Sequence, residues 1–141
     1  MNVVCPLCKS QTPASLSGTS SRCAVICKKC KTDFTCNLVR IRAKRSRGIS
    51  GITSLREFDI RVIEASGEER LIQFVNAEYG DFELRSKDEA ILTYRNQQLC
   101  LVQNLTIGLF YQVKQPNEGK AWLIAIIVVT AILLLLMFSH G

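Results

Sequence analysis

The middle of the chain alternates between hydrophobic and polar residues with a period of two. Phe58, Ile60 and Val62 alternate with Asp59 and Arg61, which is the pattern of a strand with one buried face. The pattern predicts about six antiparallel strands between residues 56 and 113. The other five expected strands, separated by turn-forming residues, lie at 71–75, 82–85, 90–94, 99–102 and 109–113.

A sheet of short strands has to curl or close in order to cover its core and limit its exposed edges. We therefore expect residues 56–113 to form a small antiparallel β-barrel of OB or SH3-like type. The similarity is one of architecture only, since the segment contains no diagnostic motif of either fold.

The hydrophobic pattern changes completely near the C-terminus. Residues 121–138 include no charge, no Gly and no Pro, and Thr130 is the one polar residue among them. As a helix these 18 residues would extend about 27 Å, close to the ~30 Å hydrocarbon core of a bilayer. A chain this small has no room to bury a helix that is apolar on every side, so we expect a transmembrane helix.

The residues that flank this segment predict its interface and its orientation. Lys114 and Lys120 bound a juxtamembrane stretch, and Trp122 stands at the start of the span, where an indole ring favours the membrane interface. Positive charge flanks only this side, and three residues follow the span. We therefore expect a tail-anchored, single-pass protein with residues 1–120 in the cytoplasm.

Composition adds a charge asymmetry and argues against several classes of catalyst. The net charge is +6, but residues 1–50 hold ten Lys or Arg and one acidic residue, whereas residues 51–113 hold six basic and ten acidic residues. The single histidine, His140, is the second-last residue, which argues against a catalytic triad or a histidine-ligated zinc enzyme. The acidic residues fall mostly in expected turns and on outward strand positions, so we expect no enzyme.

Five positive residues lie close together after the N-terminal third: Arg40, Arg42, Lys44, Arg45 and Arg47. With the Gly and Ser residues that follow, they indicate a basic, flexible linker at positions 39–55. Anionic lipid headgroups, an acidic protein and nucleic-acid phosphates are its candidate partners. We favour lipid or protein, because the chain is expected at a membrane and the run lacks the aromatic residues that stack on bases.

The strongest local signal is a pair of CxxC turns, formed by Cys5 with Cys8 and by Cys27 with Cys30 and separated by 18 residues. Each turn aims two sulfurs at one point, and two turns supply the four thiolates of a tetrahedral Zn²⁺ site. A metal would close a module that is too small to build its own core. Four sulfur ligands leave no open position, so the expected zinc is structural.

The segment with the CxxC turns resembles the zinc-ribbon family, whose paired knuckles read CPxC and CxxC ahead of short strands. The resemblance covers residues 1–38 and implies the same four cysteines as ligands. One departure is that Lys9 and Lys31 stand where many ribbons have Gly after the second cysteine. Two further cysteines, Cys23 and Cys36, are expected to be packed thiols.

Two other uses of the CxxC pairs stay open. A redox dithiol usually stands at a helix N-terminus of a thioredoxin-like unit, and no such pattern surrounds either pair. Structural disulfides require an oxidising compartment, which disagrees with the expected cytoplasmic location.

Together these features predict a non-enzymatic, membrane-anchored binding or adaptor protein. Its expected role is that of an accessory subunit or assembly factor of a membrane-associated protein complex. The alternatives are a membrane-tethered nucleic-acid-binding zinc-ribbon protein and a CxxC thiol redox or metal-sensing protein.

Overall fold

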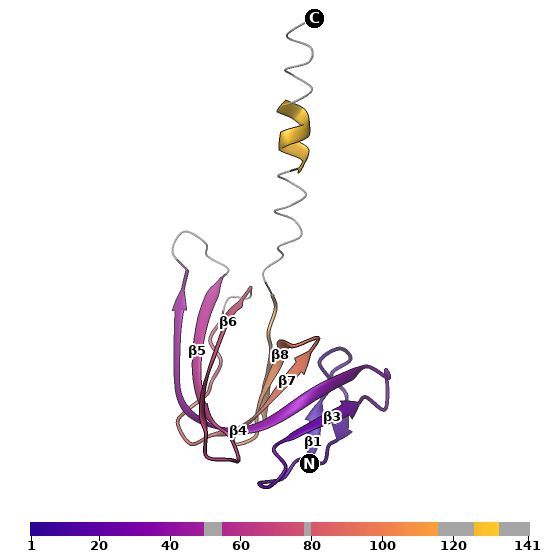
Figure 1. Cartoon of the computed structure of the whole chain (residues 1–141), viewed down its shortest axis with the longest axis vertical. Coiled ribbons are helices and arrows are strands. Elements are labelled where there is room, and N and C mark those ends of the chain that lie inside the picture. The colour runs from indigo at the N-terminus through magenta and orange to yellow at the C-terminus, as the bar shows by residue number, and fades with distance from the viewer. Residues whose placement is uncertain (50–54, 78–79, 116–125, 133–141) are drawn as a thin grey trace, which may run out of the picture.

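The computed structural model describes residues 1–49, 55–77, 80–115 and 126–132. Within these residues the chain is mostly β-sheet, as expected (Figure 1). The strands are β1 (Asn2–Val4), β2 (Gln11–Pro13), β3 (Arg22–Ile26), β4 (Asp33–Gly48), β5 (Arg56–Ile63), β6 (Glu69–Asn76), β7 (Glu89–Arg95), β8 (Gln98–Asn104) and β9 (Leu109–Gln112).

Seven of these strands form one antiparallel sheet, in the order β6-β5-β4-β7-β8-β9, with β3 added to β4. The other two, β1 and β2, pair with each other. The sheet consists of two meanders, β4-β5-β6 and β7-β8-β9, which are joined where β4 pairs with β7. Five of the six strands predicted between residues 56 and 113 are confirmed as β5 to β9.

The predicted flexible linker at 39–55 is wrong for residues 39–48, because β4 runs through them without interruption. The first part of β4 pairs with β3 and β7, and the part from Arg40 to Gly48 pairs with β5. Val39 and Ile41 are buried, whereas Arg40 and Arg42 are exposed, so the basic run follows the ordinary alternation of inward and outward positions in a strand. A register shift between Ile41 and Ala43 marks an irregularity of the kind that bends a strand.

The strand predicted at 82–85 is also absent, since these residues pair with no neighbouring strand. They instead fill the hollow of the bent sheet. The ring of Phe82 stacks on Phe58 at 4.6 Å and on Tyr111 at 4.8 Å between centroids. Phe82 and Leu84 are both buried, so their alternation with polar residues reflects burial on one side without sheet pairing.

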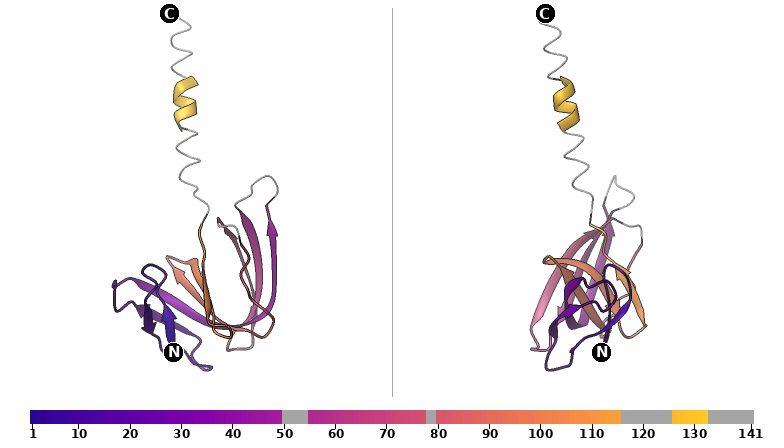
Figure 2. Two further views of the ribbon diagram at one scale, coloured as in Figure 1. Left: turned by 180° about the vertical axis from the view of Figure 1, so that it is seen from behind. Right: turned by 90° about the vertical axis from the view of Figure 1, so that its right-hand side faces the viewer.

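The sheet is bent into a trough, and strand pairing does not close it among the described residues, because β6 and β9 form its two ends (Figures 1 and 2). The two ends meet just beyond the strands. The Ala77 N–H donates to the Lys114 carbonyl at 2.7 Å, and the Lys114 N–H donates to Asn76 Oδ1 at 2.8 Å. The barrel expected from the strand pattern is thus only partly closed.

We use the term cysteine module for residues 1–38, which contribute β3 and the first part of β4 to the large sheet and pack on β7. Ile91 of β7 is fully buried within the module's hydrophobic cluster, while its neighbours Ala90 and Leu92 belong to the core of the trough. Gln103 of β8 accepts a hydrogen bond from the Val4 N–H at 3.2 Å. The strand β7 is therefore covered on both faces, which couples the module to the sheet.

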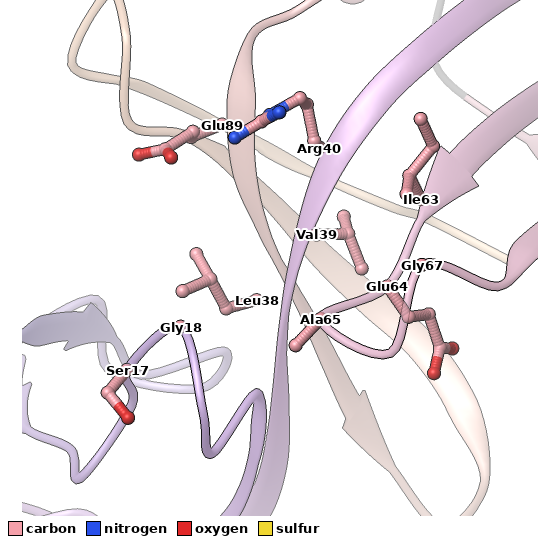
Figure 3. A pocket seen from close by; sticks show the side chains of 10 residues that line it. All are labelled: Ser17, Gly18, Leu38, Val39, Arg40, Ile63, Glu64, Ala65, Gly67 and Glu89. Atoms are coloured by element: carbon pink, nitrogen blue, oxygen red, sulfur yellow. The ribbon is translucent and has the colours of Figure 1, made fainter.

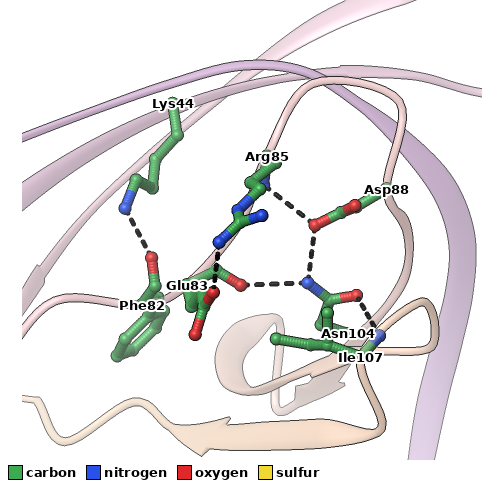
Figure 4. Close-up of polar contacts among 7 residues, drawn as sticks. All are labelled: Lys44, Phe82, Glu83, Arg85, Asp88, Asn104 and Ile107. Atoms are coloured by element: carbon green, nitrogen blue, oxygen red, sulfur yellow. Dashed lines mark hydrogen bonds and ion pairs between the residues drawn. The ribbon is translucent and has the colours of Figure 1, made fainter.

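A buried polar network fixes the turn that leads into β7 (Figure 4). Asp88 Oδ2 accepts hydrogen bonds from the Arg85 N–H at 2.9 Å and from the Asn104 side-chain amide at 2.8 Å. The same amide donates to the Glu83 carbonyl at 2.9 Å, and Asn104 is fully buried. The network ties the residues between β6 and β7 to the end of β8.

These hydrogen bonds predict that the free energy of unfolding decreases at acidic pH. The Arg85 N–H and the Asn104 amide hold the pKa of Asp88 below its ordinary value. Because the folded-state pKa is the lower one, the stabilisation is present above the unfolded pKa of about 3.9 and is lost as pH falls through the folded value. We expect urea unfolding of Asp88→Asn to show a smaller loss between pH 5 and pH 3 than wild type. Equal losses would contradict this role for Asp88.

The predicted transmembrane segment, 121–138, lies largely outside the described residues, as do Lys120 and Trp122. Its described part, 126–132, is α-helical. The Thr130 hydroxyl donates to the Ile126 carbonyl at 2.5 Å, which satisfies its donor within the helix. Among the residues that the structure describes, no helix has both the length and the apolar character needed to cross a membrane.

Candidate metal centre

The two CxxC turns have the same backbone geometry. In the first turn the Lys9 N–H donates to the Cys5 carbonyl at 3.1 Å, and in the second the Lys31 N–H donates to the Cys27 carbonyl at 3.0 Å. Lys9 and Lys31 both adopt the left-handed conformation, each with φ of 62°. This conformation is the reason why Gly suits the position, and lysine accepts it at a modest cost in strain.

The four predicted ligands, Cys5, Cys8, Cys27 and Cys30, come together in one cluster. All four sulfurs lie within 4.8 Å of one another, and the Cys5–Cys30 and Cys8–Cys27 Sγ pairs are each 3.6 Å apart. A tetrahedral zinc with Zn–S bonds of about 2.3 Å requires sulfurs about 3.8 Å apart. Sulfurs at this spacing, drawn from two separate turns, fit a four-coordinate metal ion.

Three hydroxyl groups surround the sulfurs, and sequence reasoning missed all of them. Ser10 Oγ lies 3.0 Å from the sulfur of Cys8, and Thr32 Oγ1 lies 3.1 Å from the sulfur of Cys30. The buried Thr12 hydroxyl donates to the sulfur of Cys27 at 3.7 Å. A repeated signal marks the first two, since both turns read C-x-x-C-K followed by Ser or Thr.

The surroundings of the sulfurs lower the pKa of two of the four cysteines and raise the pKa of a third. Hydrogen bonds from the Ser10 hydroxyl and the Cys30 backbone N–H lower the pKa of Cys27 to about 5. Ser10 likewise lowers the pKa of Cys8, whereas burial raises the pKa of Cys5 to about 11. The Ser10 hydroxyl therefore favours the thiolate form of Cys8 and Cys27, which is the form that binds metal.

The remaining cysteines of the module stand outside the cluster. Cys23 and Cys36 face each other across β3 and β4, and both are free thiols. Cys36 is buried, its sulfur lies 3.7 Å from the Thr93 hydroxyl, and burial raises its pKa to about 11. A thiol held neutral in an apolar cluster is a packing group, as predicted for both residues.

The five basic residues of the predicted linker do not form one surface. Lys44 donates to Asp81 at 2.9 Å and to the Phe82 carbonyl, and Arg47 pairs with Glu57 at 2.7 Å. Three others, Arg40, Arg42 and Arg45, are exposed and make no ion pair with any residue that the structure describes.

A pocket of about 340 Å³ lies beside the bend of β4, where the module meets the turn after β5 (Figure 3). Its wall includes Leu38 and Arg40 of β4 and Glu89 of β7. The carboxylate of Glu64, also on the wall, already pairs with Arg22 at 2.7 Å and with Arg70 at 3.2 Å. The pocket is therefore a seam between two packed parts and holds no converging set of reactive groups among the described residues.

Comparison with known proteins found no matching family model, curated protein or solved structure.

Proposed function

We propose that this chain is a non-enzymatic, membrane-anchored binding or adaptor protein, an accessory subunit or assembly factor of a membrane-associated protein complex. A zinc ion held by the four-cysteine cluster organises the body, and residues 121–138 anchor it with the body in the cytoplasm. The classification as a zinc ribbon followed by an OB or SH3-like barrel is part of the same proposal.

The observation that carries the membrane assignment is the exposure of the apolar helix. The side chains of Ile126, Ile127 and Val129 are between 56% and 62% exposed. No charged residue occurs between positions 121 and 138. Apolar side chains all round a helix require either a surrounding protein core or lipid. Lipid satisfies this requirement for the whole 18-residue apolar run.

Three features favour binding over catalysis. A cluster of four sulfurs is a closed coordination sphere with no position for a reacting water, which is typical of structural metal. The carboxylates of the partly buried Glu64 and the buried Asp88 are already engaged in ion pairs and hydrogen bonds. The exposed guanidinium groups of Arg40 and Arg42, at the bend of β4, are available to an acidic partner.

The membrane anchor is tested by alkaline carbonate extraction of membranes from cells that express the full chain. We expect the wild type to stay in the membrane pellet. The double variant Ile127→Lys/Val129→Lys should be extracted, because two lysines at mid-span cost about 6–8 kcal/mol of insertion free energy. The matched control, Arg40→Gln/Arg42→Gln, should stay in the pellet. A wild type recovered in the supernatant contradicts the anchor.

Nucleic-acid binding is the second candidate, favoured by the same exposed arginines. It predicts that the detergent-solubilised full chain binds single-stranded or duplex nucleic acid with an affinity that falls steeply as salt is added. The adaptor proposal instead predicts protein partners that are lost from the Arg40→Gln/Arg42→Gln variant in affinity capture followed by mass spectrometry.

A further inference from the structure

The chain leaves the sheet beside the tip of the β4–β5 hairpin. Gly48 pairs with Arg56, and Arg56 pairs with Asn76. Asn76 in turn accepts a hydrogen bond from the Lys114 N–H at 2.8 Å, at the point where the chain continues toward the apolar segment. These four residues form one row across the sheet, and we call this part of the molecule the exit end (Figures 1 and 2).

The bend of β4 lies at the opposite end. Arg40 pairs with Ile63, which is at the other end of β5 from Arg56. Seven residue steps along an extended strand cover about 24 Å. On the other edge of β4, Arg40 lies opposite Glu89 of β7. The Glu89 carbonyl accepts a hydrogen bond from the N–H of Leu105, which follows the end of β8 that is far from the exit end. Both meanders therefore place Arg40 and Arg42 far from the exit end.

Covalent geometry limits how far the exit end can stand from a membrane. Seven residue steps connect Lys114 to Ala121, and a fully extended chain covers at most about 25 Å in that number of steps. Insertion of the apolar segment therefore keeps Lys114 within about 25 Å of the hydrocarbon, and so within about 20 Å of the headgroup layer, which is some 5–8 Å thick on each side.

The exit end carries positive charge on its exposed surface. Arg45, three residues before Gly48 on β4 and opposite Asp59 of β5, makes no ion pair within the described part of the chain. Arg56 donates to the Ser46 hydroxyl at 3.4 Å, which leaves its charge unneutralised. Arg47 pairs with Glu57, but its side chain is still 65% exposed. Lys114 adds a further positive residue in the same row.

We propose that the exit end is a contact surface for anionic phospholipid headgroups, with Arg45 and Arg56 as its principal charges. This inference rests on the proposed membrane anchor and adds an orientation to it. The basic run of β4 is divided in function: its C-terminal part faces lipid, whereas Arg40 and Arg42 at the bend face away from the membrane.

The orientation is tested with isotope-labelled full-length protein in phosphatidylcholine nanodiscs that contain a gadolinium-chelating lipid, with and without phosphatidylserine. Amide relaxation caused by gadolinium reports proximity to the headgroups. With phosphatidylserine we expect the amides of Arg56 and Asn76 to relax at least about fivefold faster than those of Arg40 and Glu89, because about 24 Å separates the two rows.

Paired variants separate charge from anchoring. In Arg45→Gln/Arg56→Gln the extra relaxation caused by phosphatidylserine should disappear, whereas the control Arg40→Gln/Arg42→Gln should keep it. Both variants should retain one zinc per chain. Equal relaxation at both ends, or faster relaxation at Glu89, overturns the proposal, as does relaxation at the exit end that does not respond to phosphatidylserine. Failure of the wild type to enter nanodiscs would instead refute the membrane anchor itself.

Discussion

Replacing Cys27 with serine is expected to abolish metal binding and to unfold the cysteine module. Its sulfur is fully buried in the cluster, 3.6 Å from that of Cys8. Structural zinc contributes about 10–16 kcal/mol of apparent binding free energy in zinc-finger peptides at pH 7, which equals or exceeds the whole stability of a typical small domain. We expect zinc, measured by elemental mass spectrometry, to fall from about one ion per chain to near zero.

The loss should extend from the module into the sheet. Phe34 and Cys36 lie in the first part of β4 and belong to the module's hydrophobic cluster, which also holds Ile91 of β7. A loss of 5 kcal/mol or more corresponds to a fall in melting temperature of at least about 15 °C for a domain of this size. Circular dichroism of the detergent-solubilised full chain measures this change, and chelation of the wild type should reproduce it.

Cys23→Ser provides the matched control for the Cys27 variant. Cys23 lies on β3, four residues before Cys27, and its thiol is outside the cluster. We expect this variant to keep its zinc and to melt within a few degrees of the wild type. A Cys27→Ser protein that retains one zinc and melts normally would contradict the four-sulfur assignment.

Truncation of Phe82 to alanine is expected to cause the second large loss of stability. Its ring is 4% exposed and is stacked between Phe58 and Tyr111, with Phe74 also in contact at 5.8 Å between centroids. Removal of a buried phenylalanine ring typically costs about 3–5 kcal/mol, because the cavity left behind collapses only in part. Urea unfolding of the full chain in detergent should show this decrease in the free energy of unfolding.

Phe110→Ala is the control for this truncation. Phe110 lies on β9, next to Tyr111, but its side chain is 44% exposed. Its loss should change stability by less than about 1 kcal/mol, as is usual for surface substitutions. Equal losses for Phe82→Ala and Phe110→Ala would show that residues 82–85 do not fill the trough.

The sequence was sufficient to predict the elements whose chemistry is local. Paired CxxC turns place their own sulfurs, so the cluster of Cys5, Cys8, Cys27 and Cys30 follows from spacing alone. Period-two alternation likewise identified β5, in which Phe58, Ile60 and Val62 are buried. Short apolar runs bounded by turn residues identified β6 to β9.

The errors came from features that depend on distant partners. The basic run indicated a linker because charge density is typical of solvated segments, whereas strand pairing with β5 and β7 holds it as part of β4. Residues 82–85 alternate like a strand, yet they pair with no strand. Aromatic packing of Phe82 and side-chain hydrogen bonds from Lys44 and Asn104 hold them instead. Neither the strand pairing nor the packing across the trough can be predicted from residues that are close together in the sequence.

The positions of two of the hydroxyls around the sulfurs could have been predicted from a repeated sequence pattern. Each turn continues after its second cysteine with Lys and then a hydroxyl residue, Ser10 or Thr32. The repeated C-x-x-C-K-[S/T] pattern places a hydroxyl beside the second cysteine of each turn, Ser10 beside Cys8 and Thr32 beside Cys30. The contact from Thr12 has no such signature, because it depends on how β2 packs against the second turn.

The central claim is that four cysteine sulfurs hold one metal ion that organises the folded body of this chain. Zinc K-edge X-ray absorption on the purified full-length protein tests it most directly. The account predicts one zinc per chain, with a first shell of four sulfurs at about 2.3 Å and no nitrogen or oxygen ligand. A first shell that contains nitrogen or oxygen, or a fully folded protein without metal, would contradict it.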